Sequence, residues 1–172
     1  MREADALAAL RVDEHDVGRV VELAPLRRDP VALPHRLQAP PVAVTFVYSH
    51  CEDSCPALVD QVRGALDETG ADVPLLAVSV DPAGDTRASA RRFLNERRMT
   101  GRARFLLGDE RALAPVWKGY GVAPQRGELD HSATVVLVDA QGRQRVGFPH
   151  DQLTPEALAH DIRRLTGASA RA

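Results

Sequence analysis

Residues 42–48 (VAVTFVY) form a run of apolar and β-branched side chains without a single charge. Such a run is typical of a strand that is buried on both faces of a sheet. Similar runs follow at residues 75–80 (LLAVSV) and 134–138 (TVVLV), and a shorter one lies at residues 104–107. Strands of this kind are covered by helices, so the chain is predicted to belong to the α/β class.

Helices are predicted between and after these strands. Pro56 suits a first helical position, and apolar residues recur at helical spacing from there until Gly70. Residues 144–148 follow strand 134–138 after a short Gly-containing loop, which predicts a hairpin. The order of elements predicts an α/β three-layer sandwich with a mixed central sheet. The other predicted helices open at Asp85 or Thr86, span about residues 109–120, and run from Thr154 to Gly167.

The length of 172 residues is typical of one domain. Residues 41–167 hold every clear strand and helix and are predicted to form that domain. Residues 1–40 are predicted to be an N-terminal extension, with a short helical stretch at 4–10, a strand-like stretch at 19–23 and a series of prolines. Residues 168–172 are predicted to be a tail.

The composition excludes several classes of protein. The 22 basic residues are balanced by 24 acidic ones, and only four Phe, one Trp and two Tyr are present, which argues against a nucleic-acid partner. No segment resembles a signal peptide or approaches the roughly 18 apolar residues of a membrane span. We therefore expect contact with a membrane only through an anchor outside this sequence. A chain of this size needs no disulfide or metal to form a core, which leaves its two cysteines for chemistry.

Both cysteines lie in the segment Ser49–Pro56 (SHCEDSCP), where the first predicted strand meets its helix. Unpaired N–H groups and the positive dipole end at a helix start favour thiolate over thiol, so we expect at least Cys55 to have a lowered pKa. The charges of Glu52 and Asp53 act in the opposite direction but are screened by water. A cysteine pair at this junction of an α/β chain indicates a thioredoxin-like fold.

Cys51 and Cys55 are suited to bind one metal ion together. Residues four apart on a regular helix have Cβ atoms about 5–6 Å apart, whereas a disulfide needs about 3.8 Å, so a bridge requires Cys51 to lie off the helix. Soft thiolates select Cu(I), zinc or iron–sulfur clusters, and two thiols alone leave zinc under-coordinated. The competing interpretation is a pair of inert, buried cysteines.

A third ligand is sought among the histidines. His50 directly precedes Cys51 as the strand ends, where we expect its side chain to point away from the sulfur. His131 is the better candidate, because it lies in a polar loop that enters strand 134–138, and such a loop passes beside the first strand-to-helix junction of a thioredoxin-like sheet. Asp130 or a backbone carbonyl would hold one ring nitrogen and free the other. Taken alone, a histidine in a surface loop is more often a solvated polar side chain. The other histidines are His15, His35, His150 and His160.

Two further motifs are explained by structure rather than by chemistry. The segment Asp81–Thr86 (DPAGDT) has the residues of a phosphate or metal loop, but a turn followed by a helix cap accounts for every one of them. Trp117 and Tyr120 lie at helical spacing, which indicates packing rather than a cofactor site.

Five segments resemble the Sco/SenC family, in the same order, over roughly residues 40–166. Members of this family are thioredoxin-fold copper proteins associated with assembly of the binuclear copper centre of cytochrome c oxidase. The resemblance implies that Cys51, Cys55 and His131 bind copper, as Cu(I) or Cu(II), in an extracytoplasmic, membrane-tethered protein. The segments are TFVYSHCEDSCP at 45–56, VSVDPAGDT at 78–86, VWKGYGV at 116–122, DHSATVVLVDAQGR at 130–143 and the final helix.

Three functions follow as hypotheses. The first is a copper metallochaperone that passes its ion by ligand exchange to a copper-receiving or disulfide-bearing protein, such as an oxidase subunit, or keeps the cysteines of that subunit reduced. The second is a thiol-disulfide oxidoreductase of thioredoxin-like type, in which Cys51 and Cys55 are catalytic and His131 is dispensable. The third, a metal-free interaction module, is disfavoured by the Sco/SenC resemblance.

Overall fold

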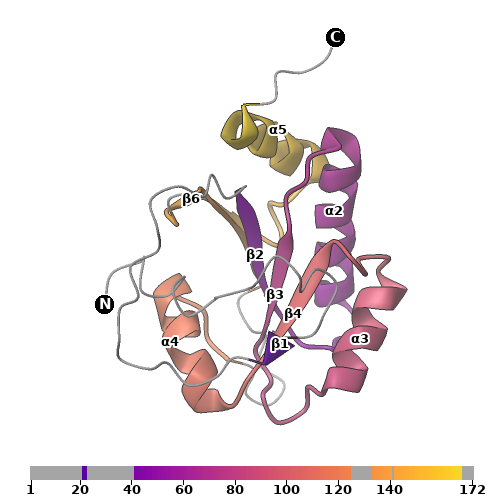
Figure 1. Cartoon of the computed structure of the whole chain (residues 1–172), viewed down its shortest axis with the longest axis vertical. Helices are drawn as coiled ribbons and strands as arrows, with labels where there is room; N and C mark the ends of the chain where they lie inside the picture. The colour runs from indigo at the N-terminus through magenta and orange to yellow at the C-terminus, as the bar shows by residue number, and fades with distance from the viewer. Residues whose placement is uncertain (1–20, 23–40, 125–132, 141, 168–172) are drawn as a thin grey trace.

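The structure, a computed structural model, describes residues 21–22, 41–124, 133–140 and 142–167. Within these residues the chain forms a six-stranded sheet in the order β1-β4-β3-β2-β5-β6 (Figure 1). The strands are β1 (Val21–Glu22), β2 (Val42–Val47), β3 (Leu75–Ser79), β4 (Ala103–Leu107), β5 (Thr134–Val138) and β6 (Gln144–Pro149). The helices are α2 (Ser54–Thr69), α3 (Arg87–Glu96), α4 (Glu110–Tyr120) and α5 (Pro155–Thr166).

The sheet is mixed, as predicted. β1, β4, β3 and β2 run parallel to one another, whereas β5 runs antiparallel to β2 and pairs with β6 in the predicted hairpin. The parallel strands β2, β3 and β4 are buried almost throughout, in agreement with their unbroken apolar sequences. β6 alternates between half-buried and exposed residues, because it lies at the edge of the sheet.

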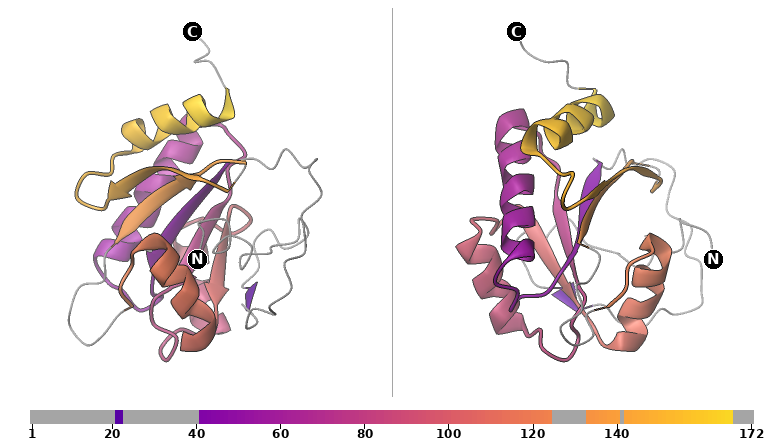
Figure 2. Two further views of the ribbon diagram at one scale, coloured as in Figure 1. Left: turned by 90° about the vertical axis from the view of Figure 1, so that its left-hand side faces the viewer. Right: turned by 180° about the vertical axis from the view of Figure 1, so that it is seen from behind.

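Helices cover both faces of the sheet (Figure 2). Helices α2, α3 and α5 pack on one face around a core that includes Leu58, Phe93 and Leu158. On the opposite face, α4 packs through Leu113 and Trp117 onto the other side chains of the same strands. This arrangement confirms the predicted α/β three-layer sandwich. It also confirms that Trp117 is a packing residue.

Side-chain caps set the starts of three helices. Thr86, Asp109 and Thr154 each accept a hydrogen bond from the backbone N–H three residues ahead, at α3, α4 and α5 respectively. The predicted start of α2 is wrong by two residues, because the helix begins at Ser54 and not at Pro56. A proline is tolerated at the third helical position, since the first four N–H groups of a helix have no partner within it.

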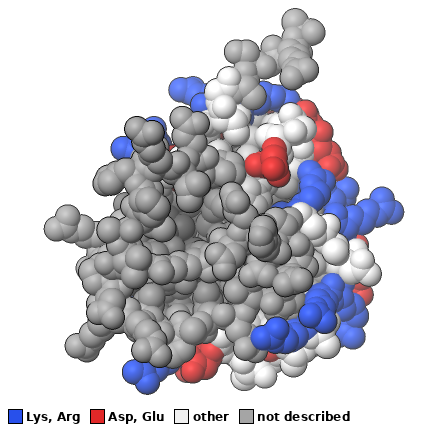
Figure 3. Space-filling model, in the orientation of Figure 1, with Lys and Arg blue, Asp and Glu red and all other residues white. Residues whose placement is uncertain are grey.

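Ion pairs connect α2 to the segment between α3 and β4. Asp60 on α2 binds Arg97 at 3.1 Å, and Asp67 binds Arg102 at 2.5 Å. Figure 3 shows basic and acidic side chains intermixed on this side of the molecule. Among the described residues, no helix is both long and apolar enough to cross a membrane.

Candidate functional site

The two cysteines lie where β2 ends and α2 begins. Residues 48–53, called here the cysteine loop, connect these elements, and the loop turns back through a hydrogen bond from the Cys51 N–H to the Tyr48 carbonyl at 3.3 Å. Cys51 therefore lies off the helix, which meets the condition that the spacing sets for a disulfide. Cys55 is the second residue of α2. Cys51 and Cys55 are not joined by a disulfide in this structure.

The sulfur of Cys51 lies at the N-terminus of α2. Its Sγ accepts the backbone N–H of Cys55 at 3.3 Å and lies 3.7 Å from the hydroxyl of Ser54. The side chain of Asp53, which occupies the N-cap position, makes no capping hydrogen bond. The first N–H groups of a helix have no partner within it and are commonly bound by a side-chain oxygen at the N-cap. In α2 the Cys51 sulfur binds one of them, that of Cys55.

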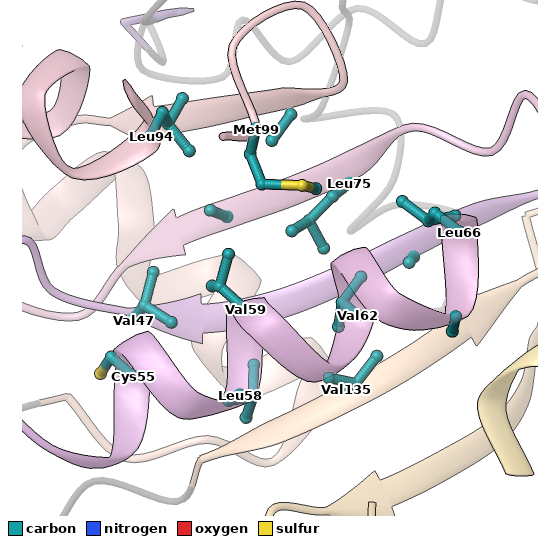
Figure 4. Close-up of a cluster of buried hydrophobic side chains, with 14 of the residues drawn as sticks. Val47, Cys55, Leu58, Val59, Val62, Leu66, Leu75, Leu94, Met99 and Val135 are labelled. Atoms are coloured by element: carbon teal, nitrogen blue, oxygen red, sulfur yellow. The ribbon is translucent and has the colours of Figure 1, made fainter. Parts of the chain in front are cut away.

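Cys55 is fully buried in the apolar core beneath the cysteine loop. Its side chain lies beside Val47 of β2, and Leu58 and Val59 follow it along α2 (Figure 4). The thiol still contacts the site, because the Cys55 side chain hydrogen-bonds to the sulfur of Cys51. One cysteine therefore faces the surface and the other the core.

This difference corrects the expectation that Cys55 has the lowered pKa. Burial raises the pKa of the Cys55 thiol, and the adjacent Cys51 raises it further. Partial burial also raises the pKa of Cys51, but hydrogen bonds from the Cys55 backbone and side chain outweigh it and leave that pKa lowered. The helix N-terminus does favour a thiolate, but the thiolate is that of Cys51.

The histidines divide between described and undescribed parts of the chain. His50 is turned toward the loop after β3, where its Nε2 donates to the Gly84 carbonyl at 2.7 Å. His150 and His160 are exposed, and His160 contacts Asp161 at 3.0 Å. His131, the predicted third ligand, lies outside the described residues, as do His15 and His35. Among the residues that are described, no group of three His, Cys, Asp or Glu side chains is placed to hold a metal ion.

Comparison with known proteins decides the family. A family model described as SCO1/SenC matches residues 30–167. The chain belongs to the SCO1/SenC family. No curated protein matches it.

Solved structures of SCO1/SenC proteins share the fold. Copper-bound ScoI of Bradyrhizobium japonicum is 31% identical, with 75% of this chain and 87% of that chain covered and a TM-score of 0.61. A SCO1/SenC family lipoprotein of Bacillus anthracis is 20% identical, with coverages of 75% and 83% and a TM-score of 0.65. BsSco, a member of the Sco family of cytochrome c oxidase assembly proteins with a disulfide switch, is 18% identical, with coverages of 75% and 81% and a TM-score of 0.62. The predicted thioredoxin-like fold is therefore confirmed.

One part of the site in this SCO1/SenC protein was not predicted from the sequence. The carboxylate of Asp85 binds both Ser49 of the cysteine loop and Ser79 at the end of β3. The turn and cap that were predicted for residues 81–86 are present, but the carboxylate of Asp85 takes part in neither. A signal was available in the apolar run 75–80, because a serine within a buried strand must find a hydrogen-bond partner.

Proposed function

We propose that this protein is a copper metallochaperone, in which Cys51, Cys55 and His131 hold one copper ion that is passed to another protein by ligand exchange. The observation that carries the proposal is the contact between the Cys55 side chain and the Cys51 sulfur, in a chain 31% identical to copper-bound ScoI. Two adjacent sulfur donors match the preference of Cu(I) for soft ligands. Residues 41–167 form the copper-binding domain in this proposal.

The two cysteines make different contributions to the binding of copper. Cys51, with its lowered pKa, supplies a sulfur that is readily deprotonated. Cys55, with its raised pKa, must lose a proton when it becomes a ligand. Copper binding is therefore coupled to proton release, and the affinity rises with pH.

The register of the sheet supports His131 as the third ligand. β5 runs antiparallel to β2 with Val135 opposite Thr45, so β5 begins at the end of the sheet where the cysteine loop follows β2. Ala133 is buried in the same apolar cluster as Cys55. His131 precedes Ala133 by two residues, a span of at most about 7 Å of extended chain. The imidazole is thus within reach of this end of the sheet.

The partner in this proposal is a protein that offers its own thiol ligands to the ion. The relation to BsSco, of a family of cytochrome c oxidase assembly proteins, supports an oxidase subunit as that partner. The relation to a SCO1/SenC lipoprotein supports an extracytoplasmic, membrane-tethered location.

The test is an anaerobic titration of the reduced protein with Cu(I) against a competing chelator. We expect the wild type to bind one equivalent of Cu(I). Removal of a residue that only supports a metal ligand lowers the affinity by roughly 10- to 100-fold, and Cys51→Ser and Cys55→Ser should each lower it by more than that. His131→Ala is expected to bind more weakly as well. The control is His160→Ala, which removes an exposed histidine on α5 and leaves the affinity unchanged. Wild-type affinity in both cysteine variants would overturn the proposal.

Thiol-disulfide exchange is a second candidate function, favoured by the lowered pKa of Cys51 and its place off the helix. Here the Cys51 thiolate attacks a partner disulfide, which forms a mixed disulfide and releases one partner sulfur as a thiol. Cys55 then loses its proton and attacks the Cys51 sulfur, which forms the Cys51–Cys55 disulfide and releases the second partner sulfur as a thiol. Oxidised protein should then lose both thiols while it stays monomeric, as thiol titration and size-exclusion chromatography measure. If Cys51→Ser reduces a partner disulfide at the same rate as the wild type, this function is ruled out.

A further inference from the structure

Asp85 lies in the loop between β3 and α3, and its carboxylate joins three groups from two other segments. Its Oδ1 accepts the backbone N–H of Ser49 at 2.7 Å and the hydroxyl of Ser49 at 2.6 Å. Its Oδ2 accepts the hydroxyl of Ser79 at 2.5 Å. Hydrogen bonds to an ionised acceptor are shorter and stronger than neutral ones, so these contacts hold Ser49 firmly.

The local structure around Asp85 does not require this carboxylate. Thr86, the next residue, caps α3 and forms a capping box with Ser89. Asp81 closes the preceding turn by accepting the N–H of Gly84 at 3.0 Å. Asp85 donates its backbone N–H to the Asp81 carbonyl at 2.9 Å, but neither the turn nor the cap uses its carboxylate. The three hydrogen bonds of that carboxylate are therefore tertiary contacts.

The partners of Asp85 are themselves fixed. Ser79 is fully buried at the end of β3, and its carbonyl accepts the indole N–H of Trp117 from α4 at 2.9 Å. The hydroxyl of Ser49 also lies 2.7 Å from that of Ser89 in the first turn of α3. The cysteine loop is thus connected to β3, α3 and, through Ser79, α4.

A second contact joins the same two loops. The ring of His50 donates from Nε2 to the Gly84 carbonyl at 2.7 Å. Ser49 and His50, the two residues directly before Cys51, are therefore both bound to the loop that carries Asp85. Beyond them, the Cys51 sulfur reaches the N–H of Cys55.

We propose that Asp85 is a positioning residue for the copper site: through Ser49 it holds the cysteine loop in the conformation that places the Cys51 sulfur at the start of α2. This inference rests on the proposed function. A ligand that is already ordered loses less conformational freedom on binding than one in a free loop. Without the carboxylate, the cost of ordering the loop reduces copper affinity.

The test compares Asp85→Ala with Asp109→Ala. Asp109 is a matched control, because its carboxylate caps α4 through the N–H of Ala112 at 2.7 Å, and none of its described contacts involves the cysteine loop. In the Cu(I) competition titration we expect Asp85→Ala to bind about tenfold more weakly. Asp109→Ala should lower the melting temperature and leave the affinity within about twofold of wild type. Equal affinity in Asp85→Ala and wild type would overturn the positioning role.

Two milder variants keep the test decisive if Asp85→Ala does not fold. Asp85→Asn retains an oxygen for the Ser49 N–H and should recover most of the affinity. Ser49→Ala retains the backbone hydrogen bond to Asp85 and should fall between wild type and Asp85→Ala. Wild-type affinity in Ser49→Ala, together with no recovery in Asp85→Asn, contradicts the proposed contacts.

A copper-free measurement separates this inference from the proposed function. Amide hydrogen exchange of the Ser49 and Cys55 N–H groups in the apo protein reports the order of the cysteine loop. We expect exchange to be at least about tenfold faster in Asp85→Ala, in line with the affinity loss, and unchanged in Asp109→Ala. If the wild type binds no copper, the metallochaperone is refuted while this measurement still decides whether Asp85 holds the loop. Unchanged exchange in Asp85→Ala refutes the role of Asp85.

Discussion

The backbone N–H of Cys55 donates a hydrogen bond to the sulfur of Cys51 at 3.3 Å. The sulfur acts as the cap of α2, a helix whose N-cap side chain, Asp53, makes no such bond. A thiolate accepts from an N–H more strongly than a thiol does, so the contact stabilises the ionised form of Cys51. Cys55 contributes a backbone donor at the same point while its own thiol stays protonated in the core.

Alkylation of the reduced apo protein should distinguish the two thiols. We expect iodoacetamide at pH 7.5 to modify Cys51 at least about tenfold faster than Cys55, because the thiolate reacts and Cys51 is the more exposed. The rate at Cys51 should reach half its maximum at a pH below 9.0, the ordinary value for a thiol. Mass spectrometry of peptic peptides after timed quenching measures both rates. Faster labelling of Cys55 would contradict the assigned geometry.

Stability at high pH should depend on Cys55. In the unfolded chain this thiol ionises near its ordinary value of 9.0, whereas in the folded protein burial keeps it protonated to a higher pH. Between the two values the unfolded state has lost a proton that the folded state retains, so the free energy of unfolding falls as pH rises, by on the order of 1 kcal/mol per pH unit. Urea denaturation from pH 8 to 10.5 measures this slope. Cys55→Ala should show a shallower slope. Cys51 contributes a slope of the opposite sign, and this contribution is present in both proteins.

The cap of α3 offers a test of local stability. Thr86→Ala removes the oxygen that accepts the Ser89 N–H at 3.1 Å and should lower the free energy of unfolding by about 1 kcal/mol. Thr86→Ser keeps the hydroxyl and should stay close to wild type. Chemical denaturation of the three proteins provides the comparison. Equal losses in both variants would show that the methyl group of Thr86, and not its oxygen, carries the stabilisation.

Phe105 on β4 should be among the most costly core positions. Its ring is fully buried and packs edge-on against Phe93 of α3, with centroids 6.0 Å apart. Phe105→Ala is expected to lower the free energy of unfolding by about 3–5 kcal/mol, since a large cavity forms between sheet and helix. Arg145→Ala on the half-exposed strand β6 is the control and should change it by less than about 0.5 kcal/mol. A loss below about 1 kcal/mol in Phe105→Ala contradicts the described packing.

Most elements of the sheet could be predicted because each is specified by its own residues. The run 42–48 contains no charge, so only a strand covered on both faces satisfies it. Thr154 followed by Pro155 supplies a cap and a residue that starts helices well, and α5 begins there. The start of α2 was misplaced because Pro56 is compatible with more than one position in a first turn, and only the neighbouring Cys51 sulfur favours the earlier start.

The sequence by itself determined the α/β class, the helix caps and the placement of two cysteines at a strand-to-helix junction, since these follow from neighbouring residues and their periodicity. Only the tertiary structure decided which cysteine faces the core and which caps the helix, because burial and hydrogen bonding depend on how β2, α2 and their neighbours pack. The same holds for Asp85, whose partner Ser49 is 36 residues away in the chain. Contacts at such separations arise from the order of strands in the sheet, which brings the ends of β2 and β3 together.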